Sequence, residues 1–495
     1  MKISRSLIGQ MGSFILICLV ACTAPQQGPS TPTQMVGPVS PTSDDHLAPT
    51  PKENLITPIE TPSTSGRSPT ATTQYFLDVA LDYEDKQLDV SQTISYTNNT
   101  NDTLFDLLLI VPPAYKKGVF SLNSVNTSQN PHGSDSKVKN AYIHLSLDTP
   151  LEINQQLEIN LEYQLRLPRG DQALGYTHRQ LLLADWYPLI PPYHDDVGWV
   201  INPPGRVGEH LVYPLSDFHL NLCLVPASED LVVAASAPVV KTQGNCYRYE
   251  QGQSRNITLA VSPDYQVSTI EDDLVTVIAY TFPEHAELGL RSAALAVQAW
   301  GTFTELFGEN QREFLSIVEA DIFDGLETDG LIYLSEWYYQ TADPSPQNYF
   351  ELLIVHETAH QWFYAYVHND QAREPWLDEA LATYCETLFY EIHHPELVNW
   401  WWHFRVAAYS PEGPVNADIY AFRQYRTYID AVYLRGAYFL QALRDEVGDP
   451  AFFEGLRKYV QSVDTQALRT GEAFFDAFSQ VTDVELSEIL AEYFQ

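Results

Sequence analysis

Basic residues are scarce in this sequence of 495 residues, which has 27 Lys and Arg against 64 Asp and Glu and a formal net charge of −37 at pH 7. Nucleic-acid binding needs a positively charged surface, so the composition argues against a nucleic-acid partner. An acidic protein is also repelled by anionic lipid. Any attachment to a membrane must therefore come from a lipid anchor rather than from surface charge.

Long apolar runs are equally rare. The clearest one covers residues 7–21 and follows Lys2 and Arg5. It is shorter than the roughly 20 residues that a transmembrane helix needs. A positive start, an apolar core and small residues before Cys22 are typical of an exported bacterial lipoprotein. We therefore predict a signal peptide over residues 1–21, a lipid on Cys22, and a protein anchored to a bacterial membrane outside the cytoplasm; an ordinary secretory signal or a membrane anchor is the alternative.

Cysteine is limited to five residues. Cys18 lies in the predicted signal and Cys22 at the predicted lipid site. Cys223 and Cys246 lie on nearby predicted strands of an exported domain, where a disulfide is permitted, but spacing alone cannot establish their proximity. Cys385 is expected to be a buried thiol, as free cysteines commonly are.

The rest of the chain divides into three regions by composition and periodicity. Residues 22–73 are rich in Pro, Ser and Thr, which predicts a flexible linker because such a segment cannot bury enough apolar area to offset the entropy of ordering. Over residues 74–271 apolar and polar residues alternate, most clearly in Leu157–Leu165, and this pattern predicts an all-β domain. From residue 272 onward the pattern becomes mixed and then mostly helical, with a long helix expected over residues 286–307.

The strongest motif is His356-Glu357-Thr358-Ala359-His360, which lies in an apolar segment predicted to be helical. Positions i and i+4 share one helix face, so His356 and His360 could bind one Zn²⁺. Glu357 lies beside them, where its carboxylate could take a proton from an attacking water. A core helix that happens to carry two histidines is the alternative interpretation.

A glutamate at the right distance strengthens this motif. Glu379 follows His360 after eighteen residues, near the start of a second predicted helix that begins after Pro375. Two histidines and one glutamate leave a zinc position open, as in catalytic rather than structural sites. Glu386 lies two helical turns after Glu379 on the same face. There it could accept a hydrogen bond from a zinc-bound imidazole, or it could be a solvated surface residue.

The order H-E-x-x-H, eighteen residues and then Glu resembles the zinc pattern of the aminopeptidase N family of gluzincin metallopeptidases. Two further segments are similar to the family: Gln361-Trp362-Phe363, and Trp376-Leu377-Asp378-Glu379-Ala380, where the family usually has Trp-Leu-Asn-Glu-Gly. The resemblance implies an α+β multidomain protein, with an N-terminal saddle-like β-sandwich domain over residues 74–271 and a mostly helical, thermolysin-like zinc peptidase domain over residues 272–495. It also implies a truncated member, without the large helical domain that follows in many relatives.

The resemblance assigns roles to two more residues. Glu327 falls on the family motif Gly-x-Met-Glu-Asn, whose glutamate binds the free amino group of the substrate; Asp324, Leu326 and Thr328 replace the Gly, Met and Asn of that motif. Tyr433 precedes Leu-Arg-Gly-Ala, as a family tyrosine precedes Lys-Gly-Ala, and would stabilise the tetrahedral intermediate.

Together these residues predict a zinc-dependent peptidase with peptide substrates and one Zn²⁺ per chain, held by His356, His360 and Glu379. The resemblance implies an aminopeptidase that acts outside the cytoplasm. Because the neighbours of Glu327 differ from the motif, an endopeptidase or oligopeptidase with the same zinc chemistry stays open. A non-catalytic binding or scaffolding lipoprotein is a further alternative, against which the intact set of zinc ligands, Glu357 and Tyr433 argues.

Overall fold

The structure is a computed structural model of the whole chain and describes residues 73–494 except 132–136, 171 and 462–467. The described residues all belong to one compact unit, Thr57–Gln495. The predicted signal peptide, Cys22 and nearly all of the predicted linker lie outside the described residues. In the described part of the chain, no helix is long and apolar enough to cross a membrane.

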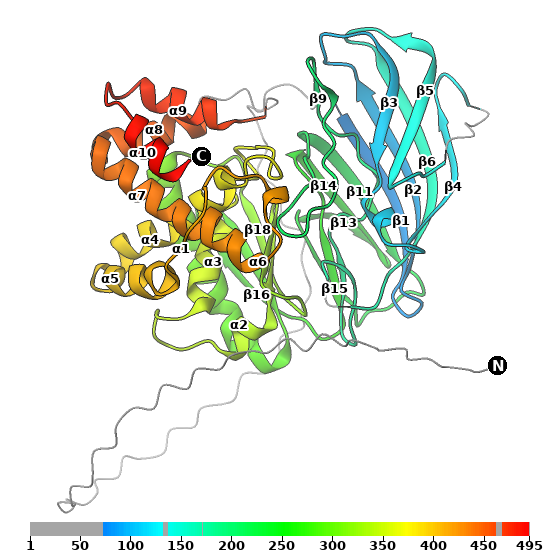
Figure 1. Cartoon of the computed structure of the whole chain (residues 1–495). Helices are drawn as coiled ribbons and strands as arrows, with labels where there is room; N and C mark the ends of the chain where they lie inside the picture. The colour runs from blue at the N-terminus through cyan, green and yellow to red at the C-terminus, as the bar shows by residue number, and fades with distance from the viewer. Residues whose placement is uncertain (1–72, 132–136, 171, 462–467, 495) are drawn as a thin grey trace, which may run out of the picture. The chain divides into compact units, whose positions relative to one another are not determined.

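A seven-stranded sheet in the order β13-β14-β11-β1-β2-β6-β4 is the largest sheet of the N-terminal region (Figure 1). Its strands are β1 (Thr73–Asp82), β2 (Gln87–Thr97), β4 (Phe120–Thr127), β6 (Gln156–Arg166), β11 (Ser216–Leu224), β13 (Val239–Gln243) and β14 (Cys246–Ser254). Neighbouring strands are antiparallel except β1 and β11, which are parallel. In β6 every second residue from Leu157 to Leu165 is buried, as the alternating pattern predicts.

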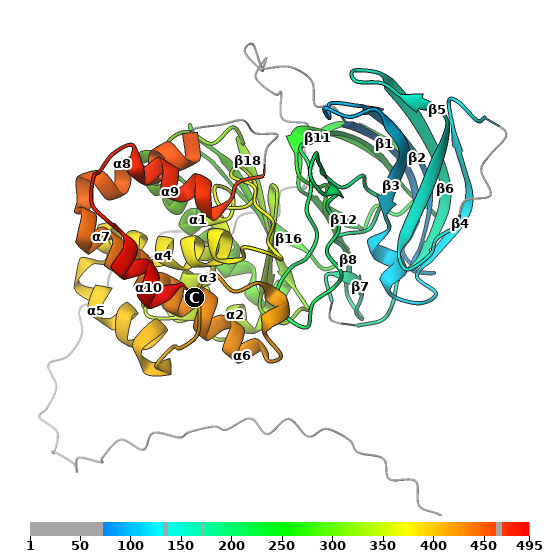
Figure 2. The same cartoon turned by 45° about the horizontal axis from the view of Figure 1, so that its top comes forward.

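Smaller sheets complete this region and share its apolar core. They are the pair β3 (Leu104–Ile110) and β5 (Tyr142–Leu151), the sheet β12-β15-β8-β7 made of β7 (Leu174–Tyr176), β8 (Leu181–Leu183), β12 (Val232–Ala235) and β15 (Leu259–Ser262), and the short pair β9 (Tyr193–His194) and β10 (Gly198–Trp199). Figure 2 shows β5 of the β3–β5 pair next to β6 of the large sheet. Buried side chains from both sheets, among them Tyr75, Leu161, Leu109 and Ile143, belong to one cluster. The region therefore has a core of its own.

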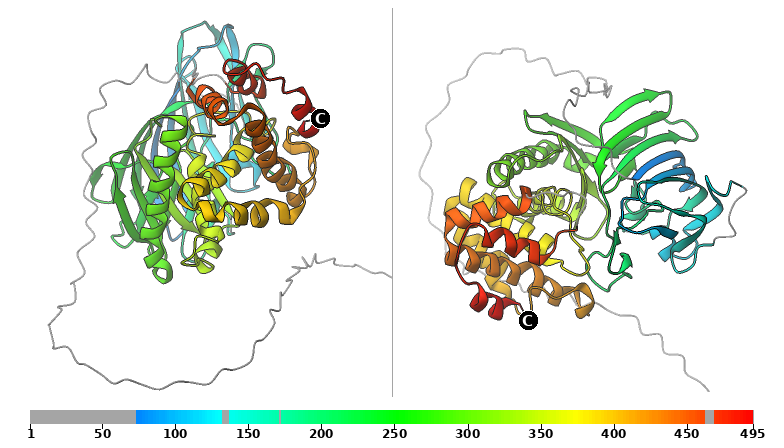
Figure 3. Two further views of the ribbon diagram at one scale, coloured as in Figure 1. Left: turned by 90° about the vertical axis from the view of Figure 1, so that its left-hand side faces the viewer. Right: turned by 90° about the horizontal axis from the view of Figure 1, so that it is seen from above.

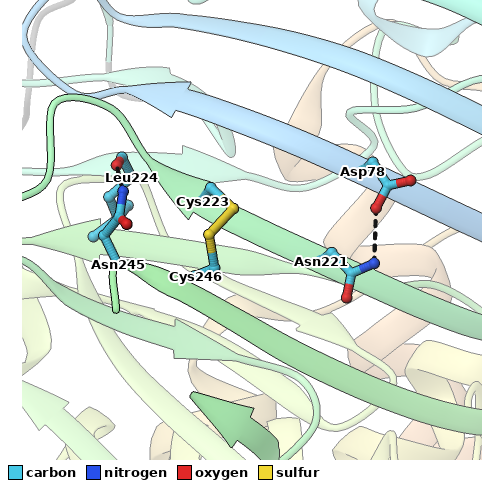
Figure 4. Close-up of a disulfide and its surroundings, with 6 residues drawn as sticks. All are labelled: Asp78, Asn221, Cys223, Leu224, Asn245 and Cys246. Carbon is cyan, nitrogen blue, oxygen red and sulfur yellow. Dashed lines mark hydrogen bonds between the residues drawn. A yellow bond between two sulfur atoms is a disulfide. The ribbon is translucent and has the colours of Figure 1, made fainter. Parts of the chain in front are cut away.

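A disulfide joins Cys223 of β11 to Cys246 of β14, which the alternating pattern alone could not establish (Figure 4). The two residues are direct partners in the antiparallel register of these strands. Beside the disulfide, Asn221 Nδ2 donates to Asp78 Oδ1 at 2.7 Å and links β11 to β1. The disulfide thus cross-links two strands that are already paired in the sheet.

The C-terminal region contains a five-stranded sheet in the order β16-β17-β18-β20-β19. Its strands are β16 (Gln266–Glu271), β17 (Thr276–Thr281), β18 (Phe314–Ala320), β19 (Gly325–Thr328) and β20 (Leu331–Ser335). The domain boundary expected after residue 271 falls between β16 and β17, which pair along their whole length. The boundary itself stays a prediction. The sequence does not reveal this pairing, because β16 continues the period-two pattern of the preceding region.

Helices pack on this sheet and form a second large core (Figure 3). They are α1 (Ala286–Phe307), α2 (Glu336–Gln340), α3 (Tyr349–Ala359), α4 (Trp376–His393), α5 (Val398–Trp401), α6 (Tyr425–Tyr428), α7 (Arg435–Val447), α8 (Asp449–Gln461), α9 (Gly471–Ser479) and α10 (Ser487–Tyr493). The bounds of α1 confirm the long helix predicted over residues 286–307. Cys385 of α4 is a buried free thiol, as expected.

Two π-helical segments interrupt the helical part, η4 (Trp402–Val406) and η7 (Ile429–Leu434). Short 3₁₀ turns are η1 (Pro112–Tyr115), η2 (Pro283–His285), η3 (Pro395–Leu397), η5 (Ala407–Tyr409) and η6 (Ile419–Ala421). π-helical turns are rare and occur frequently at functional sites. Here η4 carries Arg405 and η7 carries Tyr433. The fold class is confirmed: a β-rich N-terminal region precedes a largely helical C-terminal region.

Candidate metal centre and active site

The H-E-x-x-H motif occupies the end of α3, a helix with no polar face. The side chain of Asn348 caps its start by accepting a hydrogen bond from the backbone N–H of Glu351 at 3.2 Å. All helix residues from Phe350 to Ala359 are buried, as expected for a helix that is apolar all round. His356 and Glu357 lie in the last turn and His360 is the C-cap residue. The motif is therefore held rigidly inside the protein.

The second helix, α4, begins directly after Pro375 and places Glu379 in its first turn. Because α3 and α4 pack together, Glu379 Oε2 lies 3.4 Å from His356 Nε2 and 3.5 Å from His360 Nε2. One donor atom from each of these three residues lies within 4.8 Å of the others. Two imidazole nitrogens and one carboxylate oxygen converging on one point suit Zn²⁺.

Two carboxylates behind the histidines orient the rings. Glu386 Oε1 lies 3.0 Å from His356 Nδ1, and Asp378 Oδ1 lies 2.5 Å from His360 Nδ1. When each Nδ1–H donates to its carboxylate, the lone pair of Nε2 faces Glu379 and is available to a metal. Glu386 and Asp378 are almost completely buried, so Glu386 is not a solvated surface residue.

Arg405 fixes Glu386 from the opposite side, and the sequence patterns did not single it out. Its Nε lies 2.9 Å from Glu386 Oε2 and its Nη2 lies 2.9 Å from Glu386 Oε1, while Trp401 Nε1 donates to Oε2 at 3.0 Å. Burial alone would raise the pKa of Glu386, but Arg405 and His356 outweigh it and hold that pKa below its usual value. Glu386 is therefore kept as a carboxylate beside the imidazole.

The carboxyl group of Glu357 is buried but remains available to a ligand or a bound water. Its Oε2 has no hydrogen-bond partner among the described residues. Burial raises the pKa of Glu357 to about 8, against the opposing effect of His356 and His360. A Cβ atom at Gly325 of β19 would lie 2.1 Å from Glu357 Oε1, so any other residue there would displace this carboxyl. The arrangement suits a group that exchanges a proton with a bound water.

A cavity of about 430 Å³ opens beside these groups. Tyr433 of η7 lies at the metal end of it: its hydroxyl donates to Glu379 Oε1, and its ring is parallel to that of His356 with centroids 6.0 Å apart. The other lining residues come from several elements: Gly208, Glu209, Asp324, Gly325, Leu326, Glu327, Trp337, Tyr338, Tyr349, Leu353, Arg405, Tyr409, Tyr425, Arg426, Tyr428 and Ile429. The structure thus brings the site residues predicted in the described chain to one cavity, except Glu386, which lies behind His356.

Two further acidic side chains, Glu327 and Glu209, lie beside the metal centre, and only Glu327 was predicted. One carboxylate oxygen of Glu327 lies within 4.8 Å of a ring nitrogen of His360 and of a carboxylate oxygen of Glu357. Glu327 of β19 is buried, and Gln371 Nε2 donates both to Glu327 Oε1 at 3.2 Å and to Glu209 Oε2 at 2.8 Å. Glu209 belongs to the segment between β10 and β11, in which no motif drew attention to it. A second cavity of about 160 Å³ also reaches both glutamates.

Neither glutamate has a cationic side chain paired with it in the described part of the chain. Burial raises the pKa of Glu327 to about 8. Burial and the neighbouring charge of Glu327 raise the pKa of Glu209 well above its usual range. A buried acid beside a half-buried one favours a positively charged ligand, because a cation relieves both the repulsion between the carboxylates and the lost solvation.

The geometry defines a gluzincin-type metal centre, with two histidines on one helix and a glutamate on the next. Residues 322–493 match the model of the peptidase family M1 domain. Over these residues the chain is therefore similar to the peptidase family M1 domain, as its motifs imply, and zinc is the cofactor that this match and the donor set indicate.

Individual known proteins are also similar to this chain in sequence or in fold. Human endoplasmic reticulum aminopeptidase 1 is 24% identical over 220 residues, which are 41% of this chain and 23% of that protein. Its mouse counterpart is 31% identical over 118 residues, 22% of this chain and 13% of that protein. The matches span less than a quarter of these curated relatives. An M1 zinc metallopeptidase from Deinococcus radiodurans has the same fold, with a TM-score of 0.61 at 18% identity over 86% of this chain and 95% of that one.

Proposed function

We propose that this protein is a zinc-dependent aminopeptidase that removes N-terminal residues from peptides outside the cytoplasm. The observation that carries the proposal is the pair Glu327, which is buried, and Glu209, which is half-buried. Neither has a cationic side chain in an ion pair with it among the described residues, and both line the cavity that contains the metal centre. The α-ammonium group of a peptide is the cation that a peptidase site offers to such a pair. Its position against Glu327 would set the first peptide bond beside the metal centre.

A bound Zn²⁺ supplies the Lewis acid that polarises the scissile carbonyl and makes water a stronger acid. His356, His360 and Glu379 would hold it, with the rings oriented by Glu386 and Asp378. Glu357 would accept the proton of the attacking water and pass it to the leaving amine. Tyr433 would donate a hydrogen bond to the carbonyl oxygen as negative charge develops there.

The acidic pair also supports exopeptidase action over the endopeptidase alternative. A peptide bound across this end of the cavity would place a neutral amide beside Glu209 and Glu327 and would leave their charges uncompensated. A free amino terminus makes charge-assisted hydrogen bonds instead. The relatives agree with this substrate class: two are named endoplasmic reticulum aminopeptidase 1, and a mutant of the Deinococcus enzyme is described as bound to a Tyr-Ser-Ala substrate.

We also propose that the chain is exported and anchored to a bacterial membrane through lipid on Cys22. The support is the apolar segment that ends before this cysteine, outside the described residues, together with the disulfide between Cys223 and Cys246, which suits an oxidising compartment. Metabolic labelling with an alkyne fatty acid should mark the wild-type protein and not the Cys22→Ser variant. Equal labelling of both proteins would contradict lipid attachment at Cys22.

Peptides with free and N-acetylated amino termini test the aminopeptidase assignment. The wild type should cleave the free form much faster, and Glu327→Ala should reduce that rate by about tenfold to a hundredfold, with little effect on any residual cleavage of the acetylated form. Glu412→Gln, an exposed position outside the cavity, is the matched control for loss of one negative charge. Equal cleavage of both forms by the wild type would replace this assignment by an endopeptidase, and no cleavage of any peptide with zinc bound would favour a binding protein.

A further inference from the structure

Asp324 is an unusual residue for its position. It precedes β19 with φ = +72°, in the left-handed region that residues other than glycine seldom adopt. The family motif has glycine here, which fits this backbone without strain. Residues held in such conformations cluster at functional sites, where the surrounding structure maintains them. The carboxylate of Asp324 lines the main cavity, so a functional explanation is available.

Two tyrosines orient this carboxylate without neutralising it. The Tyr338 hydroxyl donates to Oδ1 and the Tyr425 hydroxyl donates to Oδ2, the latter at 3.2 Å. None of the ion pairs within the described part of the chain involves Asp324. The two arginines that line the same cavity are already paired, Arg405 with Glu386 and Arg426 with Asp430. The charge of Asp324 is thus available to a ligand.

Aromatic rings lie near Asp324, and three of them are open to solvent although Tyr338 is buried. Trp337 is 53% exposed and Tyr425 is 41% exposed, although both are large apolar side chains that line a cavity. Trp337 contacts Tyr338 with ring centroids 5.2 Å apart, and Phe323, 80% exposed, lies 6.4 Å from Tyr425. A carboxylate flanked by exposed aromatic faces suits an alkylammonium or guanidinium group, which gains from both the charge and the ring quadrupoles.

The order of residues along β19 shows which part of a substrate would meet Asp324. Glu327 lies at the amine end, Gly325 lies against the catalytic carboxyl of Glu357, and Asp324 comes next. An extended strand rises about 3.3 Å per residue, so the backbones of Asp324 and Glu327 lie up to about 10 Å apart, with Gly325 and the Glu357 carboxyl that it faces between them along the chain. A peptide whose amino group is at Glu327 and whose scissile bond is at Glu357 would place its second residue near Asp324.

We propose that Asp324, Trp337, Tyr338 and Tyr425 form a subsite, the Asp324 subsite, for the positively charged side chain of Lys or Arg at the second position of the substrate. The subsite rests on the proposed aminopeptidase function and adds a substrate class to it: peptides whose first bond precedes a basic residue. Asp324 is a specificity-determining residue in this arrangement, whereas the metal centre and Glu327 set the reaction and the free amino terminus.

The test compares Ala-Lys-Ala with Ala-Nle-Ala, because norleucine has nearly the shape of lysine without its charge. The wild type should show about a tenfold higher kcat/KM for the lysine peptide. Two variants remove the charge: Asp324→Asn keeps the shape and tolerates a positive φ, and Asp324→Gly fits the backbone without strain. In both variants, the kcat/KM values for the two peptides should lie within about twofold of each other. Glu412→Gln is the matched charge control and should keep the wild-type preference.

Three results would overturn the subsite: no preference in the wild type, a preference that survives in both Asp324 variants, or a preference that appears only between Lys-Ala-Ala and Nle-Ala-Ala, where the charge is on the first residue. Failure of the aminopeptidase assignment itself is distinguishable, since N-acetylated Ala-Lys-Ala would then be cleaved as fast as the free peptide, or no peptide of the panel would be cleaved. If no peptide is cleaved, the affinities of the protein for Ala-Lys-Ala and Ala-Nle-Ala, measured by calorimetry, test the subsite. Tighter binding of the lysine peptide that is lost in Asp324→Asn supports the subsite, and equal binding contradicts it.

Discussion

The two ends of the active-site cavity are built in different ways. The metal end comes from one short stretch, His356 to Glu386, carried by α3 and α4. The acidic end combines Glu209 from the β-rich region, Glu327 from the edge strand β19 and Gln371 from the loop before α4. Metal binding therefore depends on the packing of two adjacent helices, whereas recognition of the amino terminus depends on contact between segments far apart in the chain.

This difference implies that the two properties can be separated by mutation. The segment that carries Glu209 is tied to the catalytic region by Asn202 Nδ2, which donates to Asp370 Oδ1 at 2.8 Å, and by Tyr420, whose hydroxyl donates to the carbonyl of Pro203 at 2.8 Å. None of these residues contacts a zinc ligand. Changes at the acidic end should alter substrate choice and leave the metal in place, and changes at the metal end should abolish every activity.

The largest effect is expected from the double variant His356→Ala/His360→Ala. It removes two of three protein ligands, so both zinc content and peptide cleavage should fall to background. Metal analysis of the purified protein measures the first and a peptide assay the second, with exposed His403→Ala as the control for loss of an imidazole. A full equivalent of zinc in the double variant would show that the metal is bound elsewhere.

The next largest effect is expected from Glu357→Gln. The amide keeps the size of the side chain and the contact with Gly325 but cannot accept the proton of the attacking water. Turnover should fall by about 10²–10⁴ while one zinc per chain is retained. Near-normal turnover would assign the role of base to another group, and loss of zinc would show that Glu357 supports the metal centre instead.

Tyr433→Phe should have a smaller effect that is confined to catalysis. Removing one hydrogen-bond donor to the developing oxyanion costs about 10²–10³ in kcat, with little change in KM because the bond matters mainly in the transition state. Tyr438→Phe, five residues later and stacked on Trp402 outside the cavity lining, is the matched control. A change in KM alone would make Tyr433 a binding residue.

The smallest effect of the series is expected from Glu209→Gln, which sharpens the comparison between the two ends. With Glu327 still present, the affinity for a free amino terminus should drop by about tenfold, seen as a higher KM, while zinc content is unchanged. Metal analysis and steady-state kinetics on one free-amine peptide give both values. A loss of zinc from this variant would break the separation between the acidic end and the metal end.

Elements with strong local periodicity were predictable from the sequence. The alternation in Leu157–Leu165 is strand β6, and the helix expected over residues 286–307 is α1. The pairing of β16 with β17 was not predictable, because an edge strand has the same alternating pattern whichever sheet it joins. The predicted lipid site at Cys22 stays a prediction, since it lies outside the described residues.

By itself the sequence determined the class of chemistry, because the helical repeat puts His356 and His360 on one face and a second helix supplies Glu379. Tertiary structure alone decided which residues complete the site. Glu209, Gln371 and Arg405 have no diagnostic spacing, and each acts only because folding brings a distant charge or amide within hydrogen-bond distance of Glu327 or Glu386. Such contacts depend on how sheets and helices pack, and short-range sequence patterns do not carry that information.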